Sequence, residues 1–158
     1  MPIFVNDTEI SDDQVFREMQ HHPAEDRETA MKMAAEALTI RELLLQAYVS
    51  EGLGPREGSE EGDPEADDDR IQTLLDTVIK VPEADEETAR RYFENNKSEF
   101  ASLVPDGLPT FDKMKQVIID FLRDSSWRTS VTQYIKILAG KAKLAGIDLE
   151  AAETPLVR

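Results

Sequence analysis

The sequence of 158 residues contains no cysteine and no long apolar run. The absence of cysteine excludes disulfide bonds, thiolate metal sites and a cysteine nucleophile. Residues 1–10 lack the basic region and apolar run of a signal peptide. The longest apolar runs are far shorter than a membrane span. We therefore expect a cytoplasmic protein that does not insert into membranes.

Basic residues are also scarce, because 18 Lys and Arg stand against 33 Asp and Glu, giving a net charge of −15. Such a surface repels phosphate backbones, so nucleic acid is not an expected partner. Residues 51–69 hold nine acids and one base, Arg56, which is about half of the charge excess. Hydrophobic residues make up 40% of the chain, enough to build a core.

Two short polar runs invite a metal-site interpretation that their spacing does not support. His21 and His22 are adjacent, so on a helix they point about 100° apart, which favours a solvated helix end. Residues 67–69 are three aspartates without the alternate spacing and central glycine of a calcium-binding EF-hand. No Ser/His/acid arrangement or phosphate-binding glycine loop stands out. We expect no metal, no cofactor and no use of ATP.

Hydrophobic spacing and capping signals predict an all-α protein with a minor N-terminal β-hairpin. Residues 3–10 form the hairpin around Asn6-Asp7, because both residue types tolerate positive φ. Ser11 and Gln14 have the spacing of a capping box, which marks the start of the first helix. Helices are expected over residues 11–22, 26–51, 70–80, 85–96 and 110–144.

Three other segments complete this prediction of a single domain over residues 1–158. Residues 52–69 form a flexible acidic loop, since they have almost no large apolar side chain to bury. Residues 101–109 form a short connection that contains prolines and a glycine. The helix that follows would be roughly 50 Å long, with a kink near residues 124–126. Residues 147–149 are an apolar tag that returns to the hairpin.

Apolar positions on the expected helices predict the structural core. These positions are Leu44, Leu45, Tyr92, Phe93, Phe121, Trp127, Tyr134 and Leu138. Trp127 and Tyr134 share one helix face, which fits core packing or contact with a client protein. The methionines Met19, Met31, Met33 and Met114 either fill irregular gaps in the core or line an adaptable client-binding surface.

Three stretches outside the acidic loop resemble one known family. They are residues 5–23, residues 40–46 together with 82–96, and residues 126–149. The last stretch is the most specific, because its Trp, Tyr and Gly residues have the same relative positions as in that family. The chain resembles the SurA/PpiC/NifM branch of parvulin-type peptidyl-prolyl isomerases, in the chaperone portion. This resemblance implies a SurA N-terminal/trigger-factor-like helical chaperone module with a long C-terminal helix.

The resemblance does not extend to the family's catalytic domain. In family members the parvulin domain lies where this chain has only residues 101–109, and nine residues cannot build a catalytic sheet. We therefore expect no isomerase activity and no other enzyme activity. The implied function is ATP-independent binding of unfolded or partly folded polypeptides. The alternative is a dedicated assembly or adaptor protein for one enzyme partner. A homodimer through the long C-terminal helix would bury its apolar face.

Overall fold

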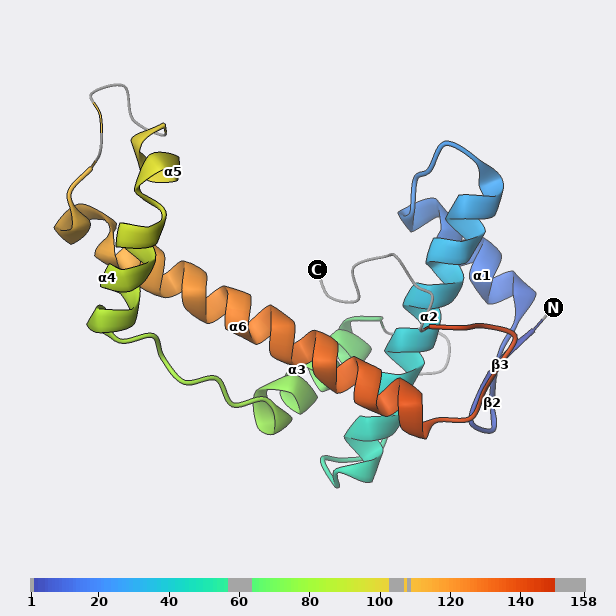
Figure 1. The fold of residues 1–158 in the computed structure, drawn as a ribbon. Helices are drawn as coiled ribbons and strands as arrows, with labels where there is room; N and C mark the ends of the chain where they lie inside the picture. The colour runs from blue at the N-terminus through green and yellow to red at the C-terminus, as the bar shows by residue number, and fades with distance from the viewer. Residues whose placement is uncertain (1, 57–63, 103–106, 108, 150–158) are drawn as a thin grey trace. The chain divides into compact units, whose positions relative to one another are not determined.

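The computed structural model of the chain describes residues 2–56, 64–102, 107 and 109–149. The fold is mostly helical, with a small antiparallel sheet of three strands (Figure 1). The chain divides into two compact units. Unit 1 comprises residues 1–79 and 131–158, and unit 2 comprises residues 80–130. The single domain expected over residues 1–158 is thus divided, and helix α6 (Phe111–Lys141) contributes to both units.

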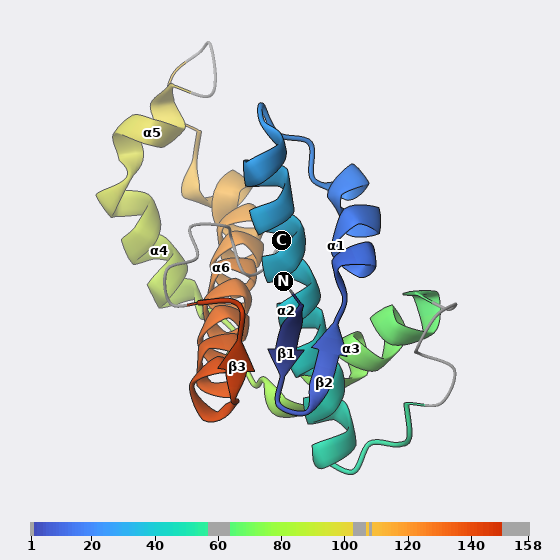
Figure 2. The ribbon, with the colours of Figure 1, turned by 90° about the vertical axis from the view of Figure 1, so that its right-hand side faces the viewer.

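The sheet belongs to unit 1 and joins the two ends of the chain. Strands β1 (Ile3–Val5) and β2 (Thr8–Ile10) form the expected hairpin, and Asn6 in its turn has a φ of 55°. Strand β3 (Leu144–Ala145) pairs with β1 on its other side, so β1 is central (Figure 2). We expected the apolar tag at residues 147–149 to return to the hairpin. Residues 144–145, just before the tag, form the strand that pairs with it.

Gly146 allows the chain to leave β3 close to the N-terminal strand. Its φ is +83°, a left-handed conformation that side chains other than glycine rarely adopt. A Cβ atom at this position would lie 2.8 Å from the backbone oxygen of Pro2. A glycine is therefore required here by both conformation and space.

Helices α1 and α2 of unit 1 both begin at a side-chain cap. Helix α1 (Asp12–Glu18) starts with the complete capping box of Ser11 and Gln14 and continues into a 3-10 turn, η1 (Met19–His21). Helix α2 (Arg27–Ser50) starts at Asp26, whose carboxylate accepts a 2.7 Å hydrogen bond from the Thr29 backbone N–H. Both α1 and α3 (Pro64–Val78) pack against α2.

The flexible loop expected over residues 52–69 is wrong for residues 64–69, because these form the start of α3. Proline is well suited to the first turn of a helix, where its missing N–H leaves no hydrogen bond unmade. Glu65 and Asp67 also lie in this first turn, where carboxylates stabilise the positive end of the helix dipole. Residues 52–56 have no helix or strand, and residues 57–63 lie outside the described part of the chain.

The core of unit 1 is formed by α2, the hairpin, α3 and the last part of α6. Its most deeply buried apolar side chains are Val5, Ala34, Leu74, Val131 and Ile135. Leu44 and Leu45 are buried, which confirms their assignment to the core. Tyr134 and Leu138 are only half-buried.

Unit 2 has an aromatic core. Helices α4 (Glu86–Asn95) and α5 (Lys97–Ala101) lie beside the first turns of α6 (Figure 1). Ala89, Phe93, Phe111 and Ile118 form the buried cluster, and half-buried Tyr92 packs against it. Trp127 is half-buried, whereas Phe121 is 46% exposed, so its assignment to the core is wrong.

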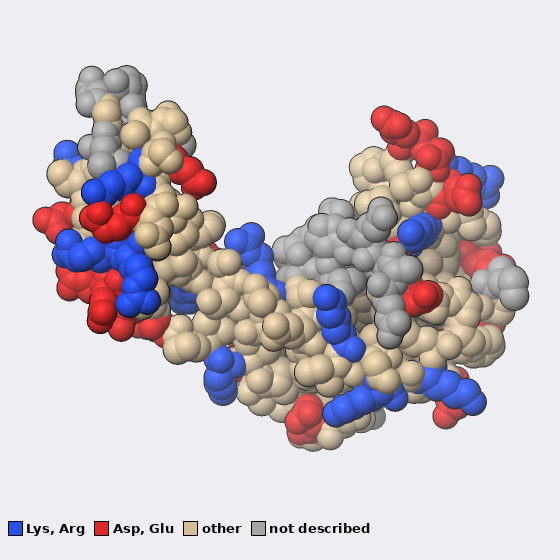
Figure 3. All heavy atoms as spheres, viewed as in Figure 1, with Lys and Arg blue, Asp and Glu red and all other residues tan. Residues whose placement is uncertain are grey.

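The outer surface of α4 carries charges of both signs, which Figure 3 shows side by side. Arg90 lies 3.5 Å from Glu86, and Arg91 lies 3.5 Å from Glu87. Both pairs have the one-turn spacing that places side chains on the same helix face. Among the described residues, no helix combines the length and the apolar composition needed to cross a membrane.

Candidate binding cavity

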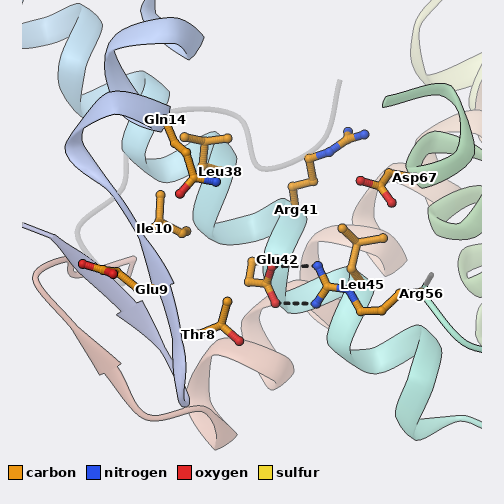
Figure 4. A pocket seen from close by; sticks show the side chains of 10 residues that line it. All are labelled: Thr8, Glu9, Ile10, Gln14, Leu38, Arg41, Glu42, Leu45, Arg56 and Asp67. Carbon is orange, nitrogen blue, oxygen red and sulfur yellow. Dashed lines mark hydrogen bonds and ion pairs between the residues drawn. The ribbon is translucent and has the colours of Figure 1, made fainter. Parts of the chain in front are cut away.

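A cavity of about 390 Å³ lies in unit 1. Its walls come from β2, α1, α2, the segment after α2 and the start of α3 (Figure 4). The lining residues are Thr8, Glu9, Ile10, Gln14, Leu38, Arg41, Glu42, Leu45, Arg56 and Asp67. The cavity thus lies where the hairpin, α2 and α3 meet.

The floor of the cavity is formed by one face of α2 and one face of β2. On α2, Leu38, Arg41 and Leu45 follow three-four spacing and share one helix face. On β2, side chains alternate between two faces, and Ile10 lies on the buried one. Leu45 and Ile10 are 3% and 4% exposed, so their apolar surface is already held in place by the core.

A bidentate ion pair fixes the segment after α2 beside the cavity. Arg56 donates from Nη1 to Glu42 Oε2 at 2.7 Å and from Nη2 to Glu42 Oε1 at 2.9 Å. Glu42 is held in turn by Gln46, whose Nε2 donates to Glu42 Oε2 at 2.8 Å. Two parallel charge-assisted bonds hold both the distance and the orientation of the guanidinium group. Figure 4 shows this pair between the strand and the start of α3.

The α3 side of the cavity carries two further ion pairs. Arg41 Nη1 donates to Asp68 Oδ1 at 2.7 Å. Asp68 is 65% exposed, so this pair contributes little to stability. Asp67 is buried, and Arg70 Nη1 donates to its Oδ1 at 2.9 Å. The rim therefore has charges of both signs, and Arg41, Glu42, Arg56 and Asp67 each have a defined partner.

The hairpin is held against α2 by two amide side chains. Asn6 Nδ2 donates to Gln46 Oε1 at 2.7 Å, and Gln46 Nε2 donates to the Val5 carbonyl at 3.1 Å. Asn6 also exchanges two bonds with Lys143, at 2.8 Å through its N–H and 2.9 Å through Oδ1. This network connects the turn of the hairpin to Glu42 and to the chain after α6, so it sets the position of β2 at the cavity.

The four methionines predicted for client binding do not line this cavity. Met19, Met31 and Met33 lie in unit 1, and Met31 is 37% exposed. Met114 lies in unit 2 and packs against the aromatic core. Their role in client binding stays a prediction.

One residue of the histidine pair, His22, makes a local contact. His22 Nε2 lies 2.9 Å from Glu18 Oε2, one helical turn away. In the described part of the chain, no group of three or more His, Cys, Asp or Glu side chains could hold a metal ion.

Sequence reasoning missed the polar side chains of the cavity, although one signal was present. Arg41 interrupts the apolar stripe of α2, and Glu42 and Gln46 have one-turn spacing. A charged residue within an apolar stripe indicates a place where the buried face meets a polar site. Arg56 and Asp67 had no comparable signal, because both lie in the acidic segment that composition assigned to a loop.

Comparisons with known proteins found no family model, no curated protein and no solved structure that matches this chain. The resemblance to the SurA/PpiC/NifM branch therefore rests on the residues of the sequence alone.

Proposed function

We propose that this chain is an ATP-independent, chaperone-like protein that binds unfolded or partly folded polypeptides and has no isomerase activity. The observation that carries the proposal is the cavity of about 390 Å³, whose lining combines aliphatic side chains with charged groups of both signs. Its volume falls within the range of ligand-binding pockets, roughly 300–1,000 Å³. The resemblance to the chaperone portion of SurA and NifM-type proteins points to the same class of ligand.

The chemistry of the cavity suits a side chain that a folded protein would bury. Leu38, which is half-buried, offers apolar contact above the buried side chains of Leu45 and Ile10, and such contact drives association by removing apolar surface from water. The ion pairs Arg56–Glu42 and Arg41–Asp68 keep the rim polar when the cavity is empty. Fully burying one aliphatic or aromatic side chain is worth about 1.5–3 kcal/mol. One such contact gives weak binding to many sequences, as a holding chaperone requires.

The first experiment measures how the protein affects aggregation of a chemically denatured client on dilution. Thr8 is exposed and lines the cavity, so Thr8→Trp places an indole there, and tryptophan suits a strand. Thr73→Trp is the matched control, because Thr73 is exposed on α3 and does not line the cavity. We expect suppression at near-stoichiometric amounts by the natural protein and by Thr73→Trp, and a clear loss with Thr8→Trp.

Three results would contradict the proposal or a part of it. Equal suppression by both tryptophan variants would place client binding outside the cavity. No suppression by the folded natural protein, together with one-to-one capture of a single enzyme, would favour the dedicated adaptor. Measurable proline isomerisation on a standard peptide would overturn the non-enzymatic part of the proposal.

A further inference from the structure

Strand β2 is an edge of the sheet. In the strand order β2-β1-β3, β2 pairs with β1 on one side, and none of the described strands pairs with its other side (Figure 2). An open strand edge presents backbone N–H and C=O groups that can pair with another extended chain.

The hairpin register shows which backbone groups point outward. Val5 and Thr8 flank a two-residue turn, so they exchange hydrogen bonds with each other. Hydrogen-bonded and non-hydrogen-bonded pairs alternate along an antiparallel ladder, and Glu9 pairs with Phe4 in the next position. The N–H and C=O of Glu9 therefore point away from β1. Within the described residues, no hydrogen bond to these two groups occurs.

The open edge borders the cavity. All three residues of β2 line it, although side chains alternate between the two faces of a strand. Figure 4 shows the Thr8 and Ile10 side chains on the α2 side of the strand and the Glu9 side chain on the other side. An extended chain placed along β2 would therefore direct every second side chain to the face on which Ile10, Leu38 and Leu45 form the cavity floor.

The charge around β2 favours a basic partner. Residues 2–16 contain four acids, Asp7, Glu9, Asp12 and Asp13, and no Lys or Arg. All four are exposed. A charged residue on an edge strand discourages pairing with most other strands, whereas an opposite charge directly across is favourable. Glu9 therefore selects for a basic residue opposite it.

We propose that β2 binds an extended polypeptide segment by β-strand addition, with apolar and basic residues alternating along the segment. Glu9 supplies the backbone N–H and C=O that pair with the segment, and its carboxylate faces a basic side chain. The alternate, apolar side chains enter the cavity. This inference rests on the proposed function and specifies which polypeptides are bound and how.

Two substitutions of Glu9 separate backbone pairing from charge. Glu9→Pro removes both the outward N–H and the carboxylate, and it does not remove a bond to β1, because Glu9 makes none. Glu9→Val removes the carboxylate and keeps the N–H. The probe is a short peptide of alternating valine and lysine. The matched control is the peptide of alternating valine and glutamate.

We expect the valine–lysine peptide to bind more tightly than the valine–glutamate peptide. Glu9→Pro loses both the donor and the carboxylate, so it should weaken binding of the valine–lysine peptide by more than about tenfold, and its excess over Glu9→Val measures the contribution of the N–H. Glu9→Val should weaken it by at most about fivefold, as expected for one cross-strand charge pair. Hydrogen–deuterium exchange of the natural protein provides a second measurement that does not depend on folding of a variant. The Glu9 amide should exchange more slowly when the peptide is bound.

The other outcomes are distinguishable. If the peptide binds with no protection of the Glu9 amide and equal affinity for Glu9→Pro, strand addition is wrong and the proposed function stands. If neither the peptide nor a denatured client binds, the proposed function fails as well. If the Glu9 amide becomes protected at high protein concentration without peptide, β2 pairs with a second copy, which overturns the inference.

Discussion

Glu36 offers the sharpest test of the described packing. It lies in the middle of α2 and is 1% exposed. Within the described residues, neither of its carboxylate oxygens has a hydrogen-bond partner. A buried polar group without a partner loses its bonds to water and gains none in return, which costs about 1–3 kcal/mol. We therefore expect Glu36 to destabilise the folded chain.

Replacing this carboxyl group by an apolar side chain of similar length should stabilise the protein. Methionine has about the same helix propensity as glutamate and adapts to irregular spaces. We expect Glu36→Met to raise the free energy of unfolding by about 1–3 kcal/mol. In a protein of this size, each kcal/mol raises Tm by about 2–4 °C.

The assay is urea unfolding followed by far-UV circular dichroism, which reports on the helices. Lys32→Met is the matched control, because Lys32 is exposed on the same helix. Its stability should stay within about 0.5 kcal/mol of the natural protein. If Glu36→Met is less stable than the natural protein, or no more stable than Lys32→Met, the carboxylate is satisfied and the reasoning is refuted.

Three further predictions concern the turn after β3, a helix cap and the aromatic core. Gly146→Ala should cost more stability than Gly52→Ala, because both have positive φ but only Gly146 has a backbone oxygen 2.8 Å from the added Cβ; equal unfolding midpoints would count against this. The Thr88 N–H bond to Asp85 lowers the pKa of Asp85 below its usual 3.8. Asp85→Ala should therefore lower the free energy of unfolding at neutral pH. This loss should shrink as the pH falls below about 4, because the carboxylate of the natural protein is then protonated. A loss in urea unfolding that is constant with pH would exclude this cause. Phe93 is 4% exposed, and its ring centroid lies 5.4 and 5.7 Å from the centroids of two other rings. Phe93→Ala should therefore lower the free energy of unfolding in urea by about 3–5 kcal/mol, and Phe93→Leu by much less. A small loss for Phe93→Ala would contradict the described core.

The elements that could be predicted from sequence are those determined by neighbouring residues. The capping box of Ser11 and Gln14 needs only three-residue spacing, and both of its predicted bonds are present. The hairpin turn at Asn6 is equally local. Short-range hydrogen bonding thus determines the helix starts and the turn.

The parts that could not be predicted depend on residues far apart in the chain. The cavity brings Thr8, Leu45 and Asp67 together, and no local pattern connects them. The start of α3 could not be recognised from the overall composition of residues 52–69, which is that of a loop. The local signal was Pro64, which is suited to the first turn of a helix. Phe121 lies on the apolar stripe of α6, yet other side chains cover its ring only in part. Periodicity identifies a helix face but not whether another element packs on it.

The central claim is that polypeptides bind at the cavity of unit 1. The most direct measurement replaces Thr8 by a photo-crosslinking amino acid and irradiates the protein in the presence of a denatured client. The same amino acid at Thr73 provides the comparison. We predict crosslinks to the client from position 8 and few from position 73. Equal crosslinking from both positions, or crosslinking from position 73 alone, would contradict the account.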